Sequence, residues 1–267
     1  IDPGVALAPN RNGRPPHPIE IDLMMKDWKK IKEYAKKAKI LIVTHYHYDH
    51  YNPEEPEIYK EKIVYLKHPT QKINKSQVGR VKYFLKKLDN LPKVIEYSDG
   101  REFKHGKTLI KFSLPVAHGA DEKLGCVTEV LIDDGKTKFI HTSDVEGATV
   151  KSQQDFIIEN DPDICIIDGP MTYIFGMHTK ALNTIIQETK RLKTLVVDHH
   201  YLRDLKWRDK LVEVYKTAEK KKVKLLCVAE FIGKKENLLE PIRKKLFEEH
   251  PAKFSKEPIY VPWLVKK

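Results

Sequence analysis

Apolar residues follow a helical spacing in some segments of this chain and form short continuous runs in others. Between Asp27 and Lys39 they fall on one stripe while lysines fill the opposite face, which predicts a helix. Directly after it, Ile40 to Val43 form an unbroken apolar run. Such a run is typical of a strand that is covered on both faces of its sheet. The pattern therefore predicts a helix that leads straight into a buried strand.

The same two patterns alternate along the rest of the chain. Short strands and turns are expected from Val94 to Ile140, where Asp133-Asp134-Gly135 is typical of a hairpin turn. Mixed strand runs flanked by helices need sheet layers that helices cover, and a four-layer αββα sandwich is one solution. No composition shift or internal repeat divides the chain, so one domain over residues 1–267 is expected. Further strands are expected at Ile63 to Leu66, Ile164 to Ile167, Leu195 to Val197 and Val223 to Val228, and helices at Ser76 to Leu88, Ser152 to Glu159, Lys180 to Arg191, Leu205 to Lys221 and after Glu240.

The first residues and the apolar runs bear on the location of the protein in the cell. Ile1-Asp2-Pro3-Gly4 is typical of a strand end that enters a turn, and no initiator Met precedes it. We therefore expect the natural protein to have an additional N-terminal strand. The opening lacks the basic and apolar segments of a secretory signal, and no apolar run approaches the roughly 20 residues that cross a bilayer. A cytoplasmic protein without a membrane partner is expected.

Charge and cysteine content leave two questions open. The excess of 49 Lys and Arg over 38 Asp and Glu gives a net charge of +11, which suits a polyanionic partner such as RNA. The lysines are spread along helix faces, however, and this favours the ion-pair surface of a heat-adapted protein. Cys126, Cys165 and Cys227 stand singly in apolar stretches, so we interpret them as small buried hydrophobic residues rather than ligands.

The segment Thr44-His45-Tyr46-His47-Tyr48-Asp49-His50 carries the clearest chemical signal. In an extended segment His45 and His47 point to the same side, so their imidazoles can hold one ion, and Asp49 and His50 follow as the chain turns. Imidazole and carboxylate are the ligands that zinc favours where thiolate is absent. A histidine-rich surface loop is the alternative, but chance rarely gives these spacings. The segment therefore predicts a metal site.

Three later segments end predicted strands with further ligand-type residues. Such ends converge on one site when the strands belong to the same sheet. Asp144 follows an apolar pair and is placed to bridge two ions. The segments are Pro115 to Gly119 with His118, Phe139 to Asp144, and Leu195 to His200 with His199 and His200.

This order of residues resembles the metallo-β-lactamase superfamily, which has an HxHxDH motif, a later His, a bridging Asp and a final His. The resemblance covers nearly the whole chain, is greatest to an archaeal branch, and implies an α+β fold of the four-layer αββα type. It also implies two divalent ions, zinc or alternatively Mn²⁺ or Fe²⁺. The resemblance assigns His45, His47 and His118 to one ion, Asp49, His50 and His199 to the other, and Asp144 to both.

A finer resemblance is to ribonuclease Z of the same superfamily, whose last ligand lies in an HFSxRY motif. The run from His199 to Asp204 keeps the first His and Arg203, which favours His199 over His200 as the ligand. Arg203 would bind a phosphate or carboxylate with its planar fork, or pair with Asp204 or another acid.

Ribonuclease Z also pairs an acidic residue with a His-x-Thr for proton transfer to the leaving group. Asp168 and His178-Thr179 match this pattern, with Asp in place of Glu. The resemblance thus implies catalytic roles for both. Judged by their own surroundings, His178 is equally a neighbour of a helix cap, and Asp168 a turn carboxylate before Gly169-Pro170.

These residues predict a metal-dependent hydrolase in which a dinuclear site activates a bridging hydroxide. Asp49 would orient that hydroxide and accept its proton, and His178 would protonate the leaving group. The first hypothesis is hydrolysis of a phosphodiester, in a small molecule or a nucleic acid. The second is hydrolysis of a small ester, thioester or lactone. A third is a nucleic-acid-binding protein that holds metal without catalysis.

Overall fold

The computed structural model describes residues 1–172 and 179–265, which group into two compact units. Unit 1 comprises Ile1–Thr70, Lys75–Tyr97 and Leu238–Lys267, and unit 2 comprises Gln71–Asn74 and Ser98–Asn237. The motif Thr44 to His50 lies in unit 1, whereas His118, Asp144 and His199 lie in unit 2. The prediction of one domain over residues 1–267 stays a prediction.

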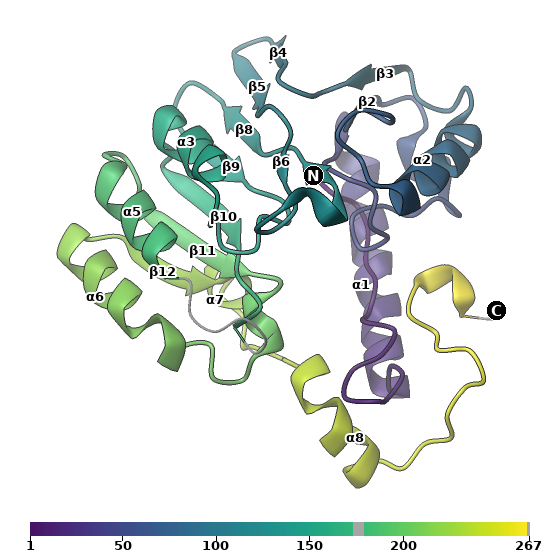
Figure 1. Ribbon diagram of the computed structural model, residues 1–267. Coiled ribbons are helices and arrows are strands. Elements are labelled where there is room, and N and C mark those ends of the chain that lie inside the picture. The colour runs from purple at the N-terminus through teal and green to yellow at the C-terminus, as the bar shows by residue number, and fades with distance from the viewer. Residues whose placement is uncertain (173–178, 266–267) are drawn as a thin grey trace. The chain divides into compact units, whose positions relative to one another are not determined.

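Unit 1 contains a parallel three-stranded sheet in the order β1-β2-β3. Its strands are β1 (Ile40–Val43), β2 (Ile63–Leu66) and β3 (Val94–Tyr97). The last three residues of β1 and of β2 are buried, as the continuous apolar runs predict. Figure 1 shows α1 (Pro18–Lys37) and α2 (Lys75–Leu88) beside this sheet. The segment from Thr44 to His50, which contains the HxHxDH motif, follows directly after the buried residues of β1.

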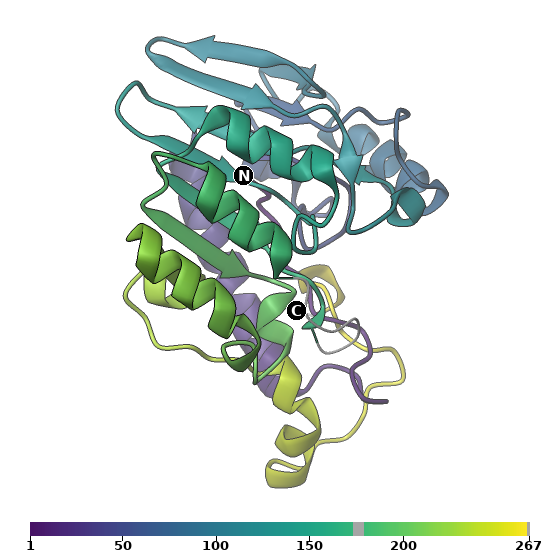
Figure 2. The same cartoon turned by 60° about the vertical axis from the view of Figure 1, so that its left-hand side comes forward.

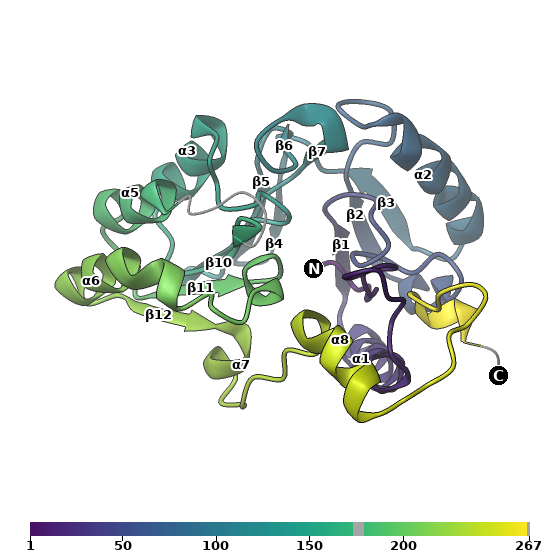
Figure 3. The same ribbon diagram turned by 60° about the horizontal axis from the view of Figure 1, so that its bottom comes forward.

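Helix α1 begins earlier than the predicted start at Asp27. Pro18 is its first residue, and His17 precedes it as the N-cap. The Glu20 carboxylate accepts a hydrogen bond from the His17 N–H at 2.8 Å, while the His17 ring accepts one from the Ile19 N–H at 3.2 Å. These bonds satisfy N–H groups that a helix start otherwise leaves unpaired. Glu20 also pairs with the buried Arg243 at the start of α8 (Arg243–Glu249), and Figure 3 shows α8 next to α1.

Unit 2 contains a mixed seven-stranded sheet in the order β12-β11-β10-β9-β8-β5-β4. Strands β9 to β12 run parallel, and β4, β5 and β8 join them through antiparallel pairs. A two-stranded ribbon, β6 with β7, precedes β8. The strands are β4 (Glu102–His105), β5 (Thr108–Phe112), β6 (Val116–Ala117), β7 (Cys126–Val127), β8 (Val130–Asp133), β9 (Lys138–His141), β10 (Ile164–Asp168), β11 (Thr194–Asp198) and β12 (Lys224–Cys227).

Helices cover one face of this sheet. Figure 2 shows α3 (Lys151–Asn160), α5 (Lys180–Glu188) and α6 (Val212–Lys221) lying side by side over the strands. The short helix α7 (Val228–Phe231) follows β12. Because the strands between helices run parallel, their carboxyl ends share one edge, where the loops after β9, β10 and β11 lie. Single 3₁₀ turns occur at Pro56–Tyr59, Glu122–Leu124, Tyr201–Arg203, Asp209–Leu211, Glu240–Ile242 and Pro262–Leu264.

Most of the predicted elements of unit 2 are confirmed, and two helices are shorter than predicted. The helix expected to end at Arg191 ends at Glu188. The helix expected from Leu205 begins only at Val212, because residues 205–208 form a turn and Asp209–Leu211 a 3₁₀ turn. The Asp204 carboxylate accepts a hydrogen bond from the Lys206 N–H at 2.9 Å, which favours a turn over a helix there. The hairpin at Asp133-Asp134-Gly135 is confirmed, since β8 and β9 pair antiparallel and Gly135 has φ of 85°.

The α+β class expected from the sequence is confirmed by these helices and mixed sheets. Cys126, Cys165 and Cys227 are buried and take part in no disulfide, so the expectation that they are buried is also confirmed. Within residues 1–172 and 179–265, no helix combines the length and apolar character needed to cross a membrane.

Candidate metal centre

The loop after β1 brings its ligand-type side chains together. The His45 Nε2 and His47 Nδ1 atoms are 3.0 Å apart, and the rings of His45 and His50 have centroids 3.9 Å apart. A backbone hydrogen bond of 3.0 Å from the His50 N–H to the His47 carbonyl closes the turn. This turn brings the Asp49 Oδ2 to 3.9 Å from the His50 Nε2. The four motif residues thus present nitrogen and oxygen atoms to a common region, as their spacing predicts.

Asp2 and Gln77 support this loop, and sequence reasoning missed both. The Asp2 carboxylate accepts hydrogen bonds of 2.8 Å from the N–H and the Oγ1 hydroxyl of Thr44, and lies 2.9 Å from the His50 Nδ1. Gln77 accepts a hydrogen bond of 3.1 Å from the Tyr46 N–H and lies 3.3 Å from the His47 Nε2. A carboxylate on one ring nitrogen orients the other nitrogen toward a metal. No local pattern could reveal these two partners, which lie far from the motif in sequence.

In unit 2, Asp144 lies between two histidines. Its Oδ2 atom is 3.3 Å from the His118 Nε2 and 3.8 Å from the His199 Nε2. Burial lowers the pKa of His118, but the adjacent Asp144 carboxylate outweighs this effect and the net pKa is raised. His118 and Asp144 are buried, whereas the His199 side chain is 32% exposed. One carboxylate oxygen therefore faces two imidazoles, as a bridging ligand would.

His200 and Asp168 form a buried pair that the sequence did not predict. The His200 Nδ1 is 2.9 Å from each oxygen of the Asp168 carboxylate. Asp168 was expected to serve His178, which lies outside the described residues. The long-range pairing of β10 with β11 aligns Asp168 with Asp198, two residues before His200. Register between strands therefore determined this pair, and one sequence does not give that register.

Arg203 lies close to the last predicted ligand. Its Nη2 is 3.4 Å from the His199 Nε2. Asp204, the alternative partner considered for Arg203, instead contacts the Thr172 hydroxyl at 2.7 Å and the Lys210 ammonium. The guanidinium thus lies beside the ligand nitrogen of His199, where it can meet an anionic ligand of that site.

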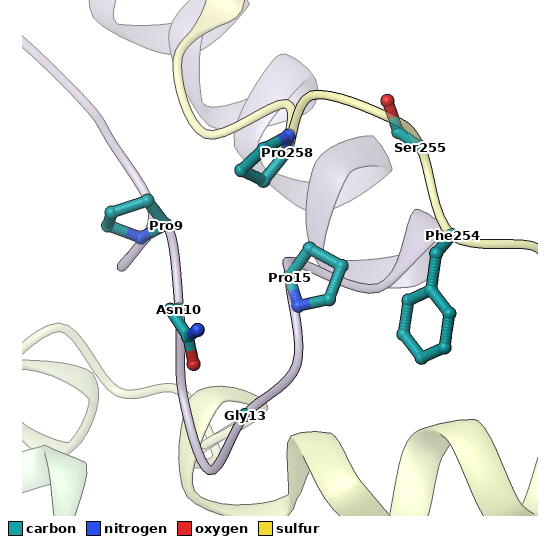
Figure 4. Close-up of a pocket in the computed structure, with 7 residues that line it drawn as sticks. All are labelled: Pro9, Asn10, Gly13, Pro15, Phe254, Ser255 and Pro258. Atoms are coloured by element: carbon teal, nitrogen blue, oxygen red, sulfur yellow. The ribbon is translucent and has the colours of Figure 1, made fainter.

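Two further features of the described residues do not belong to this centre. Cys227, Glu230 and Glu236 place ligand-type atoms within 4.8 Å of one another. The Arg208 guanidinium already contacts both carboxylates, at 2.7 Å and 2.5 Å, so this group is an ion-pair cluster. Figure 4 shows a surface pocket of unit 1 with a volume of 360 Å³, and none of its lining residues is a predicted site residue. It is lined by Pro9, Asn10, Gly13, Pro15, Phe254, Ser255 and Pro258.

Among solved structures, the chain is similar to an isothiocyanate hydrolase from *Delia radicum* gut bacteria, at a TM-score of 0.52 and 16% identity over 73% of this chain and 76% of the other. It is also similar to YhfI from *Bacillus subtilis*, a metallo-β-lactamase fold protein, at a TM-score of 0.49 and 19% identity over 74% and 78%. At such identities the likeness concerns the fold alone. No family model matches the chain. The order of the His and Asp loops is the one by which the sequence resembles the class of metallo-β-lactamase proteins.

Two archaeal relatives identify the family of the chain. A UPF0282 protein of *Korarchaeum cryptofilum* is 45% identical over 94% of this chain and 87% of its own length. The UPF0282 protein MJ1629 of *Methanocaldococcus jannaschii* is 42% identical over 92% and 87%. The chain belongs to the UPF0282 family.

Proposed function

We propose that the protein is a cytoplasmic metal-dependent hydrolase whose seven predicted ligands hold two divalent ions, zinc in the first instance. The observation that carries this proposal is the position of Asp144, whose Oδ2 faces both His118 and His199. Bridging is the role that the metallo-β-lactamase resemblance gives to this residue. The ligands of unit 1 would complete the two sets.

The donor atoms fit divalent ions of the zinc type. Two ligands at about 2.0–2.2 Å from one tetrahedral ion lie roughly 3.3–3.6 Å apart. The separation of 3.3 Å between His118 Nε2 and Asp144 Oδ2 matches this value, and the separations of 3.0 Å for His45 with His47 and 3.8 Å for His199 with Asp144 lie close to it. Imidazole and carboxylate without thiolate also suit Mn²⁺ or Fe²⁺.

We propose His199 rather than His200 as the final ligand. The His199 Nε2 faces Asp144, whereas the His200 Nδ1 is held by both oxygens of Asp168. The two rings contact each other edge to face, with centroids 4.4 Å apart. His199 has φ of 54°, and His200, with φ of −64°, is the N-cap of the following 3₁₀ turn, so the backbone directs the two side chains differently. The His199 ring is therefore directed toward the proposed ion, while the His200 ring is held by Asp168 in the protein interior.

Bound ions would supply Lewis acidity and a nucleophile derived from water at neutral pH. The residues of the chain would do the rest. Asp49 would orient the nucleophile and accept its proton, and His178 would donate a proton to the leaving group. Arg203 would bind a negatively charged oxygen of the substrate, since its guanidinium lies beside His199.

This position of Arg203 favours a phosphodiester as the substrate, in a small molecule or in a nucleic acid. A phosphodiester keeps a negative charge throughout the reaction, so a fixed guanidinium stabilises both its ground state and its transition state. A small ester, thioester or lactone is the second candidate, because Lewis-acid polarisation of a carbonyl needs the same ions. The third candidate is a protein that binds nucleic acid without catalysis. We rank it last because it would not require two complete sets of metal ligands.

The test combines metal analysis with an activity screen. The purified protein should contain close to two zinc or similar ions per chain. It should also hydrolyse a phosphodiester reporter faster than lactone and thioester reporters. Asp144→Ala should lose metal and all activity, because it removes the bridging carboxylate. His105→Ala, on β4 and outside the predicted set, serves as the matched histidine control and should keep both. Metal-free protein that takes up no ion on reconstitution would contradict the proposal.

A further inference from the structure

We propose that Asp168 is a positioning residue that fixes the two ligand-bearing loops of unit 2, an inference that rests on the proposed metal-dependent function. Asp168 is the last residue of β10, which lies between β9 and β11 in the sheet. Asp144 follows β9 and His199 follows β11. The side chain of Asp168 is buried and faces both of these loops. From this place in the sheet, Asp168 can fix the position of one loop relative to the other.

The loop that carries Asp144 is held by three hydrogen bonds to Asp168. The Asp168 Oδ2 accepts one from the Glu146 N–H at 2.9 Å, and the Asp168 carbonyl accepts one from the Gly147 N–H at 2.8 Å. The Asp168 N–H donates to the Thr142 hydroxyl at 3.2 Å. These bonds hold the chain on both sides of Asp144.

The loop that carries His199 is held through its next residue. The Asp168 Oδ1 accepts a hydrogen bond from the His200 N–H at 3.0 Å, and both carboxylate oxygens lie 2.9 Å from the His200 Nδ1. His199 is thus fixed between β11 and an anchored residue. One carboxylate accepts a backbone N–H from each of the two loops.

Backbone conformation in these loops requires such support. Ser143, Glu146 and His199 have φ of 58°, 47° and 54°, the left-handed region that side chains other than glycine disfavour. Conformations of this kind persist only where surrounding contacts hold them. Ser143 adjoins the predicted ligand Asp144, His199 is itself a predicted ligand, and Glu146 donates its N–H to Asp168. The hydrogen bonds to Asp168 therefore hold the loops in the conformation that presents Asp144 and His199.

Asp168 also acts on His118 through Glu146. The Glu146 Oε1 is 3.6 Å from the His118 Nδ1, so the carboxylate lies behind the ring nitrogen that would not face the ion. By fixing the Glu146 backbone, Asp168 places this carboxylate. The segments that carry all three predicted ligands of unit 2 are thus linked to Asp168.

Asp168→Asn tests this role while keeping the shape of the side chain. The amide of Asn has one oxygen that accepts a hydrogen bond, and its NH₂ group is itself a donor and cannot accept the second backbone N–H. At most one of the two loops therefore keeps its hydrogen bond to this side chain. The matched control is Asp163→Asn. Asp163 is equally buried and precedes β10 at its other end, where it accepts the Lys138 N–H at 3.0 Å and pairs with Arg191 at 2.9 Å.

The first measurement is titration of zinc into metal-free protein. Asp168→Asn should bind zinc about 10–100-fold more weakly than the unsubstituted protein, as is typical when a residue behind a ligand is changed. Asp163→Asn should stay within about twofold. A loss shared by both variants would mean a general loss of stability and would overturn the inference. Unchanged zinc affinity with an altered dependence on the leaving group would assign Asp168 to proton transfer with His178 instead.

The second measurement is amide hydrogen exchange in the metal-free protein. The Glu146 and His200 amides, which donate to Asp168, should exchange faster in Asp168→Asn and stay unchanged in Asp163→Asn. Unchanged exchange at both amides would overturn the inference. If the unsubstituted protein takes up no metal, the proposed function fails, whereas the exchange experiment still decides whether Asp168 fixes the loops.

Discussion

Glu129 lies fully buried at the start of β8, and replacing it with Gln should stabilise the protein in a pH-dependent way. Among the described residues, neither of its carboxylate oxygens has a hydrogen-bond partner. Burial raises its pKa well above the ordinary value of 4.5. A carboxyl group in such surroundings takes a proton rather than remain charged.

The magnitude follows from the cost of that proton. In the unfolded chain the group ionises above its ordinary pKa of 4.5, whereas in the folded chain it stays neutral to a higher pH. The stability that is linked to the titration of Glu129 is therefore fully present below the unfolded pKa and is lost as the pH rises toward the folded pKa. Each pH unit between the unfolded pKa and the folded pKa costs about 1.4 kcal/mol of folding free energy. Glu129→Gln removes this cost, because an amide has a similar shape and no charge to lose.

Thermal unfolding at pH 4 and pH 7 provides the assay. The advantage of Glu129→Gln should be small at pH 4 and larger at pH 7, and each kcal/mol gained should raise the Tm by about 2 °C for a chain of this size. Glu102→Gln, an exposed glutamate on β4, is the control and should change neither value. An advantage that is equal at the two pH values, or a loss at pH 7 alone, would refute a buried neutral carboxyl group.

Three further predictions concern the site loops. His199→Ala should lose one ion per chain by elemental analysis while His200→Ala keeps both, and the reverse result would refute the proposed register. His178→Ala should slow alkyl phosphodiesters about 100–10,000-fold more than nitrophenyl ones at unchanged metal content, and equal slowing of both would exclude a proton donor. Gly169→Ala should destabilise the fold by about 3 kcal/mol in chemical denaturation, because the added Cβ would lie 1.3 Å from the buried Tyr201 ring.

The elements that could be predicted from the sequence are those whose pattern is local. β1 and β2 have the predicted bounds, because a strand that is covered on both faces needs apolar residues at consecutive positions, and each run supplies four. The start of α1 was missed because the apolar stripe begins later than the helix. Its first turn is stabilised by His17, Glu20 and the distant Arg243, so the apolar stripe gives no signal for it.

The predicted ligands follow the same rule. His45, His47, Asp49 and His50 lie close together because their spacing within one loop dictates it. The residues behind them were missed, since Asp2 reaches His50 only through the three-dimensional fold. Such partners lie tens of residues away and share no periodicity with the motif.

Asp168 shows why the role of a residue is harder to predict than its presence at a site. Its position after a strand and before Gly169-Pro170 was visible in the sequence, and its partner was expected to be His178. His178 lies outside the described residues, so that pairing stays a prediction. The parallel register that sets Asp168 opposite Asp198 directs the carboxylate to His200 and to the backbone of two loops. A carboxylate that accepts two backbone N–H groups and faces an imidazole has most of its acceptor positions filled. Strand register therefore makes Asp168 a support for the ligands, and a single sequence cannot supply that register.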